Sequence, residues 1–441
     1  MYDSDKTYRL FTDFGSRSSK NEFQSLDNFI ELFNRQNEKG KFKVEEISFK
    51  DLDQWNFDND CLSHNSGKFF KIEGITVSTN FGNLHYWEQP IINQAEIGIL
   101  GILTKVFNGT RYFLMQAKME PGNINTLQLS PTVQATKSNF SLVHKGNAPH
   151  YLEYFVNRSK CKILIDQLQS EQGGRFLKKR NRNMIIEIEE SIDVFDNFFW
   201  LTLAEIKKLL KIDNFVNMDA RSVISTIPLI SCYYDEGLYR KSDILSWYID
   251  QKVKYELELE RIPLISLNYW DFDDYSIHRD DKFFSVIAVK VEAKTREVSS
   301  WTQPMIKDLN IGLMGFIVKK IRGDYHFLVQ AKVMPGNIDI IDLSPTVSCS
   351  NYIRSNPLFI EYFTGRKLAK ILYNTIQSEE GGRFYHLQNR NMIVEIDEEE
   401  KIILPENYTW VSHNQMTDFM KHGMFNVEAR SLISTIDFIT Y

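Results

Sequence analysis

The chain is an internal tandem, and this duplication limits its possible folds more than any other feature of the sequence. Long segments of the first half return in the second with most residues unchanged. The paired segments are QAKMEPGNINTLQLSPTVQ from Gln116 with QAKVMPGNIDIIDLSPTVS from Gln330, QSEQGGRF from Gln169 with QSEEGGRF from Gln377, and ARSVISTI from Ala220 with ARSLISTI from Ala429. Each copy spans about 180 residues, enough to bury a core of its own, so the sequence predicts two homologous domains rather than a solenoid.

The sequence around these repeats divides into four expected segments. We expect an N-terminal extension with a helix, a first repeat, a helical connector and a second repeat, over residues 1–44, 45–230, 231–261 and 262–441. The extension contains SLDNFIELFNRQNEKG from Ser25, with an N-cap residue, apolar residues at helical spacing and a terminal glycine. In the connector, apolar residues recur at helical spacing ahead of Pro263, namely Ile244, Leu245, Tyr248, Ile249 and Val253.

Each repeat is predicted to be rich in strands. Short runs of β-branched and aromatic residues indicate strands within KFFKIEGITVST, IGILGILTKVF and RYFLMQAKM, and within KFFSVIAVKVEA, IGLMGFIVKKI and YHFLVQAKV. The tetrapeptide PGNI at Pro121 and Pro335 predicts a turn. Residues 152–174 and 360–382 place apolar side chains at helical spacing before a Gly-Gly pair, which predicts a helix in each copy. The expected fold class is α+β.

Composition excludes several classes of protein. The formal net charge is −6 and the isoelectric point is near 5.9, so the chain lacks the broad basic surface of a nucleic-acid-binding protein. Its four cysteines form no CxxC pair, which argues against a zinc ribbon, a redox motif or a disulfide framework. The longest apolar run, Ile97–Leu103, is too short to span a bilayer, and the N-terminus does not resemble a secretory signal. We expect a cytoplasmic protein with no membrane and no nucleic-acid partner.

The QSE-x-GGRF segment is the first candidate site. It places Glu171 and Arg175, or Glu379 and Arg383, on either side of two glycines that leave backbone amides accessible. An arginine fork and unshielded N–H groups both donate to anions, so this segment is a candidate for binding phosphate. The alternative is structural, with a Glu–Arg pair that joins a helix end to a strand.

The QAK…PGNI…SPTV segment is the second candidate site. Its polar residues are Gln116, Lys118, Asn123, Thr132 and Gln134 in the first copy and Gln330, Lys332, Asn337 and Thr346 in the second. A lysine beside a cleft can bind phosphate or stabilise an enolate oxygen, whereas the alternative is a solvated strand face. Trp87 and Trp301 each stand in a W-x-Q-P segment, and the sequence leaves two roles for them: stacking on a base or sugar, or packing in the core. The arginines of ARS, Arg221 and Arg430, could bind phosphate or form an internal ion pair, and the sequence does not distinguish these roles.

The sequence contains no motif for a metal ion or a nucleotide cofactor. None of its nine histidines forms HExxH or another metal-ligand spacing, and GxGxxG, GxxxxGK[ST] and GxSxG are missing. His144 and His150 fall in a stretch where the first copy is longer than the second, and an imidazole there can act as an acid or a base. The alternative is an ordinary surface histidine. We expect no metal site and no cofactor.

The doubled motifs resemble those of the NDP-hexose 2,3-dehydratases, a family of sugar-nucleotide enzymes. The likeness rests on QAK-x-x-PGNI…SPTV and QSE-x-GGRF in both copies. It implies duplicated Nudix-like domains, a homodimer, and a thymidine-diphosphate 4-keto-6-deoxyhexose as substrate on the way to 2,6-dideoxy sugars. It also implies that no external cofactor is consumed and that a downstream 3-ketoreductase takes the product.

The sequence departs from a hydrolytic Nudix domain in one respect. A Nudix hydrolase carries G-x5-E-x7-R-E-x2-E-E-x-G, whose glutamates bind magnesium. Where the Arg-Glu pair belongs, this chain has Gln167 and Leu168 in the first copy and Thr375 and Ile376 in the second. Because carboxylates are the hard ligands that magnesium needs, we expect a scaffold that keeps nucleotide binding and loses hydrolysis.

The family chemistry implied by the resemblance is a proton-transfer elimination. A base removes the hydrogen at carbon 3, donors stabilise the enolate, and a general acid expels the hydroxyl of carbon 2 as water. We assign Glu171 or His144 as the base, Lys118 as the enolate stabiliser and Arg175 as a diphosphate ligand, in a pocket of the first copy. Besides the polar residues and tryptophans named above, the expected substrate-binding residues are Tyr154, Gly173, Gly174, Tyr362, Glu379, Gly381, Gly382 and Arg383.

Two other functions remain open at this point. One is a catalytically silent nucleotide-sugar binding protein that retains both pockets for ligand only. The other is a metal-dependent NDP-sugar hydrolase, against which the missing Nudix carboxylates count.

Overall fold

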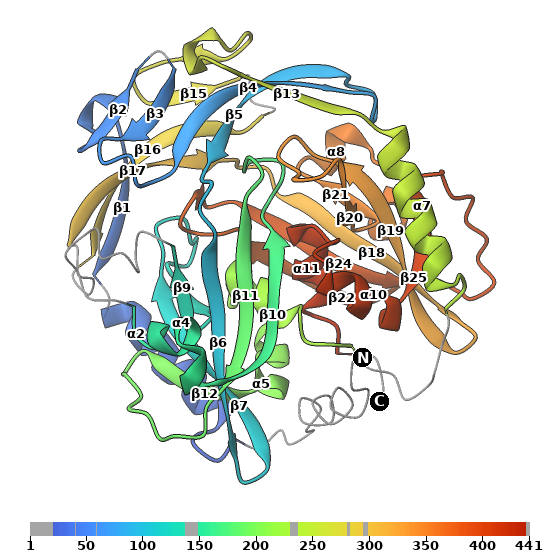
Figure 1. Cartoon of the computed structure of the whole chain (residues 1–441), viewed down its shortest axis with the longest axis horizontal. Coiled ribbons are helices and arrows are strands. Elements are labelled where there is room, and N and C mark those ends of the chain that lie inside the picture. Colours follow the sequence, from blue (N-terminus) through green and yellow to red (C-terminus); the bar gives the residue numbers. More distant parts are fainter. Residues whose placement is uncertain are drawn as a thin grey trace.

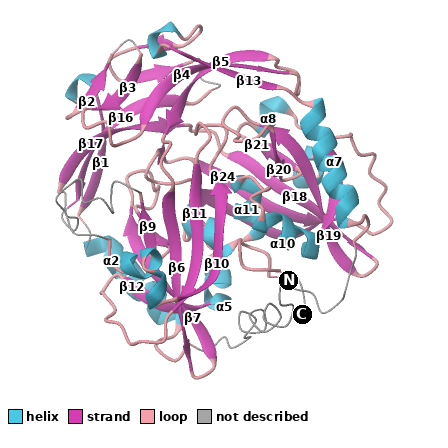
Figure 2. Cartoon of the chain, viewed as in Figure 1, coloured by secondary structure: helices cyan, strands magenta, loops and turns pink. Residues whose placement is uncertain are grey.

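Two large mixed sheets, one from each repeat, form the body of the molecule, and a further group of strands lies beside both (Figure 1). This computed structural model describes residues 21–39, 41–58, 60–136, 149–229, 237–279, 283–293 and 299–437. Strands dominate all three groups and helices accompany them (Figure 2), so the fold is α+β, as predicted. Within the described ranges, no helix is long and apolar enough to cross a membrane.

The first large sheet has the strand order β10-β11-β6-β7-β12, with β8 beside β7 and β9 beside β6. It is mixed, because β6 runs parallel to β11 and antiparallel to β7. Its strands are β6 (Gly98–Phe107), β7 (Thr110–Met119), β8 (Leu127–Ser130), β9 (Val133–Ala135), β10 (Lys162–Ser170), β11 (Arg180–Glu187) and β12 (Phe198–Thr202). Side chains alternate between the faces of a strand. One face therefore packs on α2 (Leu26–Lys39), α5 (Leu203–Leu209) and α6 (Met218–Ile224), and the other on α4 (Leu152–Val156).

The second large sheet repeats this plan, with the order β20-β19-β18-β24-β22 and with β21 beside β18 and β25 beside β19. Its strands are β18 (Gly312–Ile321), β19 (Asp324–Val333), β20 (Ile341–Ser344), β21 (Val347–Cys349), β22 (Lys370–Ser378), β24 (Gln388–Glu395) and β25 (Tyr408–Ser412). One face packs on α7 (Lys241–Lys254), α10 (His413–Lys421) and α11 (Val427–Ile433), and the other on α9 (Ile360–Phe363) and α8 (Tyr352–Ser355).

The remaining strands exchange between the repeats. In one sheet β1 (Phe42–Ile47), from the start of the chain, pairs with β16 of the second repeat. In the other, β13 (Leu257–Ile262) pairs with β4 of the first repeat. The other members are β2 (Trp55–Phe57), β3 (Cys61–His64), β4 (Lys71–Thr79), β5 (Tyr86–Asn93), β14 (Asp271–Phe272), β15 (Ser276–His278), β16 (Ser285–Ala293), β17 (Ser300–Lys307) and β23 (Phe384–Tyr385). Each repeat thus lends a strand to the other, which the repeat pattern alone does not predict.

The predicted N-terminal helix is present as α2. Ser25 caps it, since its Oγ accepts from Asn28 N at 3.2 Å. Phe29 and Phe33 are buried against the first sheet, and the Phe33 ring lies 4.6 Å from that of Phe215. The amphipathic spacing read from the sequence therefore identifies the face that packs.

The helices predicted over residues 152–174 and 360–382 are wrong for most of their length. Helix α4 ends at Val156, and β10 and β22 occupy the second half of each segment. In β10, Ile165 pairs with Ile185 of β11, while Leu168, predicted on a buried helical face, is 42% exposed. The isoleucines suit a strand, and pairing with β11 overrides a helical spacing that extends over only a few residues.

The connector forms α7, and its predicted apolar face is right only in part. Ile244 and Tyr248 are buried against the second sheet, but Ile249 and Val253 are exposed. The helix also ends at Lys254, before Pro263, because the alternating residues Leu257–Ile262 pair as β13 with β4. Short 3-10 turns complete the chain at Phe49–Asp51, Arg158–Lys160 and Leu264–Ser266.

Candidate functional site

Tight turns from the two repeats dock on each other in reciprocal pairs. Gly122 N, in the first P-G-N turn, donates to Gly381 O of the second repeat at 2.7 Å. Gly336 N, in the second P-G-N turn, donates to Gly173 O of the first repeat at 2.6 Å. The QAK…PGNI segment of one repeat therefore meets the Gly-Gly turn of the other, and any pocket here is built from both halves of the chain.

Glycine is required at these contacts for steric reasons. A Cβ on Gly122 would lie 1.7 Å from Phe384 O, and a Cβ on Gly336 would lie 1.7 Å from Phe176 O. No side chain fits there, so only glycine permits the approach of the two backbones. The repeated glycines of the sequence thus position the turns, whatever they bind.

Lys118 lies at the centre of a polar cluster beside the first of these docked turns. Its Nζ is 2.9 Å from Glu120 Oε1 and donates to Gln134 Oε1 at 2.5 Å. Gln134 in turn donates to Asp219, in the first turn of α6. Strand β7 and its turn supply the lysine and Glu120, whereas β9 and α6 supply the other two side chains.

The second repeat adds a carboxylate to this cluster. Glu380 accepts from Gly382 N at 2.9 Å, and its neighbour Gly381 lies so close that a Cβ there would be 3.0 Å from Glu120 Cβ. Glu171, directly after β10, lies within electrostatic range of the cluster, because its charge acts on both Glu380 and Asp219. We call Lys118, Glu120, Gln134, Glu171, Asp219 and Glu380 the Lys118 site.

Burial favours the protonated form of several of these carboxyls. It raises the pKa of Asp219 well above its ordinary value, and the neighbouring carboxylates raise it further. Burial likewise raises the pKa of Glu380 to about 7, although the guanidinium of Arg383 opposes this. The pKa of Glu171 is raised by burial too, against the opposing charge of Arg430. Acid and base forms are therefore both within reach in one small site.

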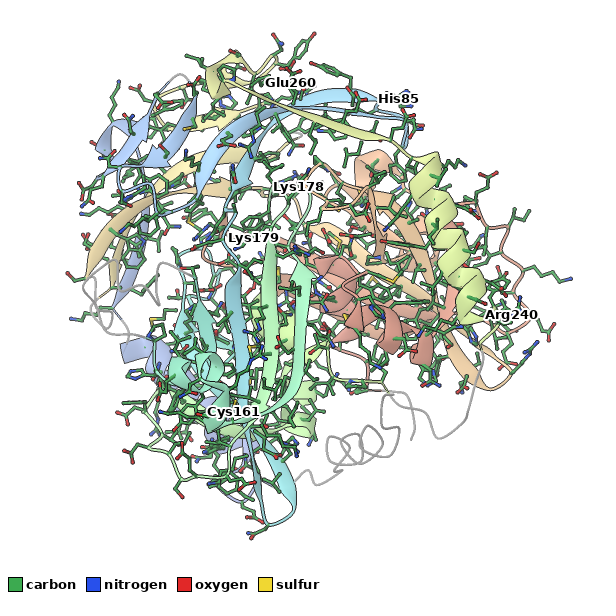
Figure 3. All side chains as sticks on the ribbon, viewed as in Figure 1. His85, Cys161, Lys178, Lys179, Arg240 and Glu260 are labelled. Atoms are coloured by element: carbon green, nitrogen blue, oxygen red, sulfur yellow. The ribbon has the colours of Figure 1, made fainter. Side chains whose placement is uncertain are left out.

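Lys179 adds a second ammonium group near Glu171. Burial lowers the pKa of Lys179, while the carboxylate of Glu171 opposes the shift. Its Nζ donates to Glu96 O, and Figure 3 labels it with Lys178 near the centre of the molecule, beside the upper group of strands.

The equivalent cluster around Lys332 has lost two carboxylates. Met334 stands where the first copy has Glu120, and Gln172 stands where the second copy has Glu380. Lys332 Nζ donates to Ser348 O at 2.6 Å instead of to a glutamine side chain. Beside it, Glu379, Asn391 and Glu428 help to line a cavity of about 10 Å³, room for roughly one water molecule. We call Lys332, Met334, Gln172, Ser348, Glu379 and Glu428 the Lys332 site.

The two ARS arginines join the halves internally. Arg221 donates to Ser378 O at 2.6 Å and to Ser431 Oγ at 2.7 Å, both in the second repeat. Arg430 donates to Ser222 Oγ at 3.2 Å and to Ser170 O, both in the first. Both guanidinium groups are buried, so each braces the strand end that carries Glu379 or Glu171.

Comparison with known proteins gives this architecture a family. The sequence profile of the NDP-hexose 2,3-dehydratases matches residues 26–227 and again residues 241–436. The chain belongs to the NDP-hexose 2,3-dehydratase family. Each match covers one large sheet with its helices and also strands of the third group, so the family profile describes one repeat.

Three similar proteins are each named dTDP-4-dehydro-6-deoxy-alpha-D-glucopyranose 2,3-dehydratase. The proteins of Saccharopolyspora spinosa and Amycolatopsis orientalis are both 42% identical to this chain, over 90% of its length and 88% and 87% of theirs. That of Streptomyces violaceoruber is 38% identical over 90% of this chain and 93% of its own.

In this family member, Arg175 does not form the predicted pair with Glu171 but contacts residues of the second repeat. Arg175 lies 3.8 Å over the Phe284 ring and 3.7 Å from Asp308, both in the second repeat. Arg383 makes the reciprocal contact, 4.2 Å over the Phe70 ring of the first repeat. Arg175 therefore sits with the Gly-Gly turn that faces the Lys332 site, not the Lys118 site.

The predicted glutamates bond to asparagines of the adjacent strands. Asn181 donates to Glu171 at 2.8 Å, and Asn389 donates to Glu379 at 2.5 Å. Both carboxylates are buried at equivalent strand ends. The sequence placed them beside a helix end, but the preceding segment is a strand in each copy.

The predicted tryptophans act on the Gly-Gly turns through the glutamine of each W-x-Q-P segment. Trp87 donates to Gln89 at 2.8 Å, and Gln89 donates to Gly174 O at 3.0 Å. Trp301 donates to Gln303 at 2.9 Å, which donates to Gly382 O at 2.7 Å. The indoles are partly buried and orient the side chains that hold the turns.

Several predicted binding residues have bonds within their own repeat. Thr132 Oγ1 accepts from Leu103 N and Thr346 Oγ1 accepts from Ile317 N, each at 2.9 Å. The side chain of Asn123 donates to Thr126 O and that of Asn337 donates to Lys332 O, next to their P-G-N turns. Gln116 and Gln330 lie half-buried on β7 and β19, two residues before the site lysines.

The predicted tyrosines, Tyr154 and Tyr362, lie in α4 and α9, on the face of each sheet opposite α6 or α11. Tyr362 donates to Glu400 at 2.8 Å, and burial raises the pKa of Tyr154 to about 12 beside Glu190. His144 lies outside the described residues. His150 is exposed, and its ring stacks on that of Phe195 at 3.8 Å.

Sequence reasoning assigned no role to three carboxylates of the Lys118 site. Glu120 and Glu380 each stand at a position where the other copy has an uncharged residue, and that difference is the signal that could have marked them. Asp219 immediately precedes ARS, and Glu428 occupies the same place in the second copy. An acid retained at both positions is a comparable signal.

Proposed function

We propose that this chain is a hydro-lyase that removes the C-2 hydroxyl of a dTDP-4-keto-6-deoxyhexose to give a 3,4-diketo-2,6-dideoxyhexose. The sequence supports this through relatives that carry the name of that activity and match 90% of the chain. The chemical observation that supports the proposal most strongly is the Lys118 site. There the lysine lies among carboxyls from both repeats, and burial raises the pKa of Asp219 and brings that of Glu380 to about 7.

The reaction uses proton transfers alone. A base removes the hydrogen of carbon 3, and the electron pair of that bond moves toward the carbonyl of carbon 4 as an enolate. The enolate then forms the double bond between carbons 2 and 3 while the C2–O bond breaks and the hydroxyl leaves as water. The resulting enol gives its hydroxyl proton away and takes a proton at carbon 2. Carbon 3 is oxidised as carbon 2 is reduced, so no external oxidant enters.

The side chains of the Lys118 site match these roles. The ammonium of Lys118 stabilises the enolate oxygen, because a buried cation is effective where water is excluded. Glu171 is the described candidate for the base, and His144 remains the alternative. Arg383 lies on the Gly-Gly turn that faces this site, so we assign the diphosphate to it in place of Arg175.

Wider features of the family resemblance are also part of the proposal. We propose that the repeats divide near residues 45–230 and 262–441 and that each is a Nudix-like domain, as its mixed sheet with flanking helices suggests. We further propose a cytoplasmic homodimer whose unstable product passes to a 3-ketoreductase. No cofactor is required by the electron balance above.

A trapping experiment tests this function. The purified chain is incubated with dTDP-4-keto-6-deoxyglucose and a 3-ketoreductase with its nicotinamide cofactor, and the nucleotide sugars are analysed by mass spectrometry. We expect a dTDP-dideoxyhexose that has lost one oxygen relative to the substrate. Recovery of unchanged substrate that nevertheless binds would identify a binding protein, and release of sugar phosphate on adding magnesium would identify a hydrolase.

The assignment of the base has its own test. Glu171→Gln and His144→Asn are assayed separately for turnover, and we expect one of them to lose about 10²- to 10⁴-fold. Near-normal turnover in both variants would show that the base is another residue.

A further inference from the structure

We infer that Glu380, which the second repeat contributes, is the general acid that expels the C2 hydroxyl at the Lys118 site. This inference rests on the proposed function and adds to it a catalytic residue from the other half of the chain. The first-copy residues would then supply the lysine and the base, and the second copy the acid.

The docked turns bring Glu380 to the site. The bond from Gly122 N to Gly381 O, at 2.7 Å, fixes the residue next to Glu380 against the turn that follows Glu120. A Cβ on Gly381 would lie 3.0 Å from Glu120 Cβ, so the two acidic residues come from backbones in contact. The charge of Lys118 also acts on Glu380, which places the lysine within electrostatic range.

The carboxyl group of Glu380 is held at one oxygen and open at the other. Oε1 accepts from Gly382 N at 2.9 Å, and a Cβ on Gly382 would lie 2.3 Å from this oxygen. Within the described residues, no hydrogen bond is formed to Oε2. The side chain is partly exposed.

A second observation indicates that a polar ligand belongs in this space. Glu120 is 5% exposed, and its Oε2 has no hydrogen-bond partner among the described residues, although Oε1 pairs with Lys118. An acceptor left without a partner in a buried site is destabilising. A sugar hydroxyl bound between Glu120 and Glu380 would satisfy it.

The carboxyls of Glu120 and Glu380 lie in different electrostatic environments. Glu120 forms an ion pair with the ammonium of Lys118 at 2.9 Å. Burial raises the pKa of Glu380 to about 7, and the charge of Glu120 adds to this shift. A carboxyl that holds its proton near neutral pH can donate it, as a general acid must.

In this step the proton of Glu380 moves to the oxygen of carbon 2 as the C2–O bond breaks, and water leaves. The electrons of the broken bond stay with the departing oxygen, and the electrons of the enolate form the C2–C3 double bond. The enol hydroxyl then loses its proton, which returns to Glu380, while the base returns its proton to carbon 2. No further reactant is needed.

The Lys332 site lacks this acid. The equivalent position is Gln172, whose amide cannot donate a proton as an acid, and Met334 replaces the neighbouring carboxylate. The chain therefore already contains both residues at this position, glutamine in the first copy and glutamate in the second. The Gly-Gly turn accommodates either one.

Glu380→Gln tests the inference, with Gln172→Glu as the matched control. Each variant is checked for thermal stability and dTDP binding, then incubated with dTDP-4-keto-6-deoxyglucose in D₂O with and without the 3-ketoreductase. For Glu380→Gln we expect trapped product to fall about 10²- to 10⁴-fold, while deuterium still enters carbon 3 of the recovered substrate. For Gln172→Glu we expect turnover within threefold of wild type.

Two outcomes with Glu380→Gln would overturn the inference. Turnover within threefold of wild type would show that the carboxyl is not the acid. Loss of both product and carbon-3 exchange, with dTDP binding intact, would assign Glu380 to proton abstraction instead. A wild-type chain that forms no trapped product would overturn the proposed function itself, and this assignment with it.

Discussion

At the scale of single residues, the two copies differ most where chemistry is expected. Lys118 and Lys332 occupy the same position on β7 and β19, yet only Lys118 has a carboxylate, Glu120, within 3 Å. The backbone supports both lysines equally. The difference between the sites therefore comes from a few side chains and not from the fold.

Replacing Lys118 should separate binding from catalysis. For Lys118→Met we expect turnover to fall at least about 10²-fold, because the enolate loses its cation. The dissociation constant for dTDP should change less than about threefold, since the lysine faces the hexose in our proposal. Calorimetric titration and the trapping assay measure the two effects. Lys162→Met, at an exposed lysine of β10, is the control. Equal losses of binding and turnover would contradict the role assigned to Lys118.

Asp342 gives a test of the buried charge. It is buried on β20, and burial raises its pKa from 3.8 to about 7, partly opposed by Arg430. A carboxyl whose folded pKa is raised stabilises the fold below its unfolded pKa, and this contribution is lost as the pH rises through about 7. The first copy has Gln128 at this position, bonded to Ser378 at 2.8 Å.

We therefore expect Asp342→Gln to be nearly as stable as wild type at pH 4 and more stable at pH 8, by about 1–3 kcal/mol. Urea unfolding at the two pH values measures the difference. A stability gain that is the same at both pH values would show that the carboxyl does not titrate as described.

At the scale of elements, the reciprocal turns determine where the site residues lie. The Gly122 turn is held by backbone contacts that exclude any Cβ. Gly174, in the Gly-Gly turn of the first repeat, is less constrained, because a Cβ there would meet only the flexible end of Met334 at 3.2 Å.

Gly122→Ala should therefore be strongly destabilising, by about 3 kcal/mol or more, since backbone would have to move. Gly174→Ala should cost about 1 kcal/mol or less. Thermal unfolding compares the two variants. Equal melting temperatures would mean that the turns are not packed as described.

The sequence predicts an element well when residues of that element alone determine its structure. Helix α2 follows from its own cap and spacing, and the strands of KFFKIEGITVST and RYFLMQAKM follow from alternating residues. Strand β10 does not follow from its own residues, because its apolar spacing fits a helix or a strand and pairing with β11 selects the strand. The same holds for β13, which pairs with a strand far away in the sequence.

The candidate site was predictable in its residue types but not in its grouping. The motifs identify Lys118 and Glu171, and the structure places both near the first P-G-N turn. Nothing in the sequence indicates that Gly122 contacts Gly381 rather than Gly173, because the two Gly-Gly turns are nearly identical. Long-range docking separates Arg175 from the site to which it was assigned.

At the scale of the whole molecule, the repeats are interdependent. Strands β1 and β13 complete sheets of the opposite repeat, and Arg221 and Arg430 bond across the junction. A single repeat would expose sheet edges and lose the hydrogen bonds that its buried arginine forms across the junction.

We expect residues 21–229 expressed alone to aggregate or remain unfolded, as judged by circular dichroism and size-exclusion chromatography. Co-expression with residues 237–441 should restore a soluble complex with turnover. A monomeric, cooperatively folded first repeat would contradict the interdependence of the two halves.

The central claim is that one reaction centre, built around Lys118 from both repeats, performs the elimination. A crystal structure with a dTDP-hexose bound tests it most directly. Our account predicts the hexose between Lys118 and Glu380, with its hydroxyl at carbon 2 within hydrogen-bond distance of the Glu380 carboxyl. A hexose enclosed only by the Lys332 site, with the Lys118 site empty, would contradict it.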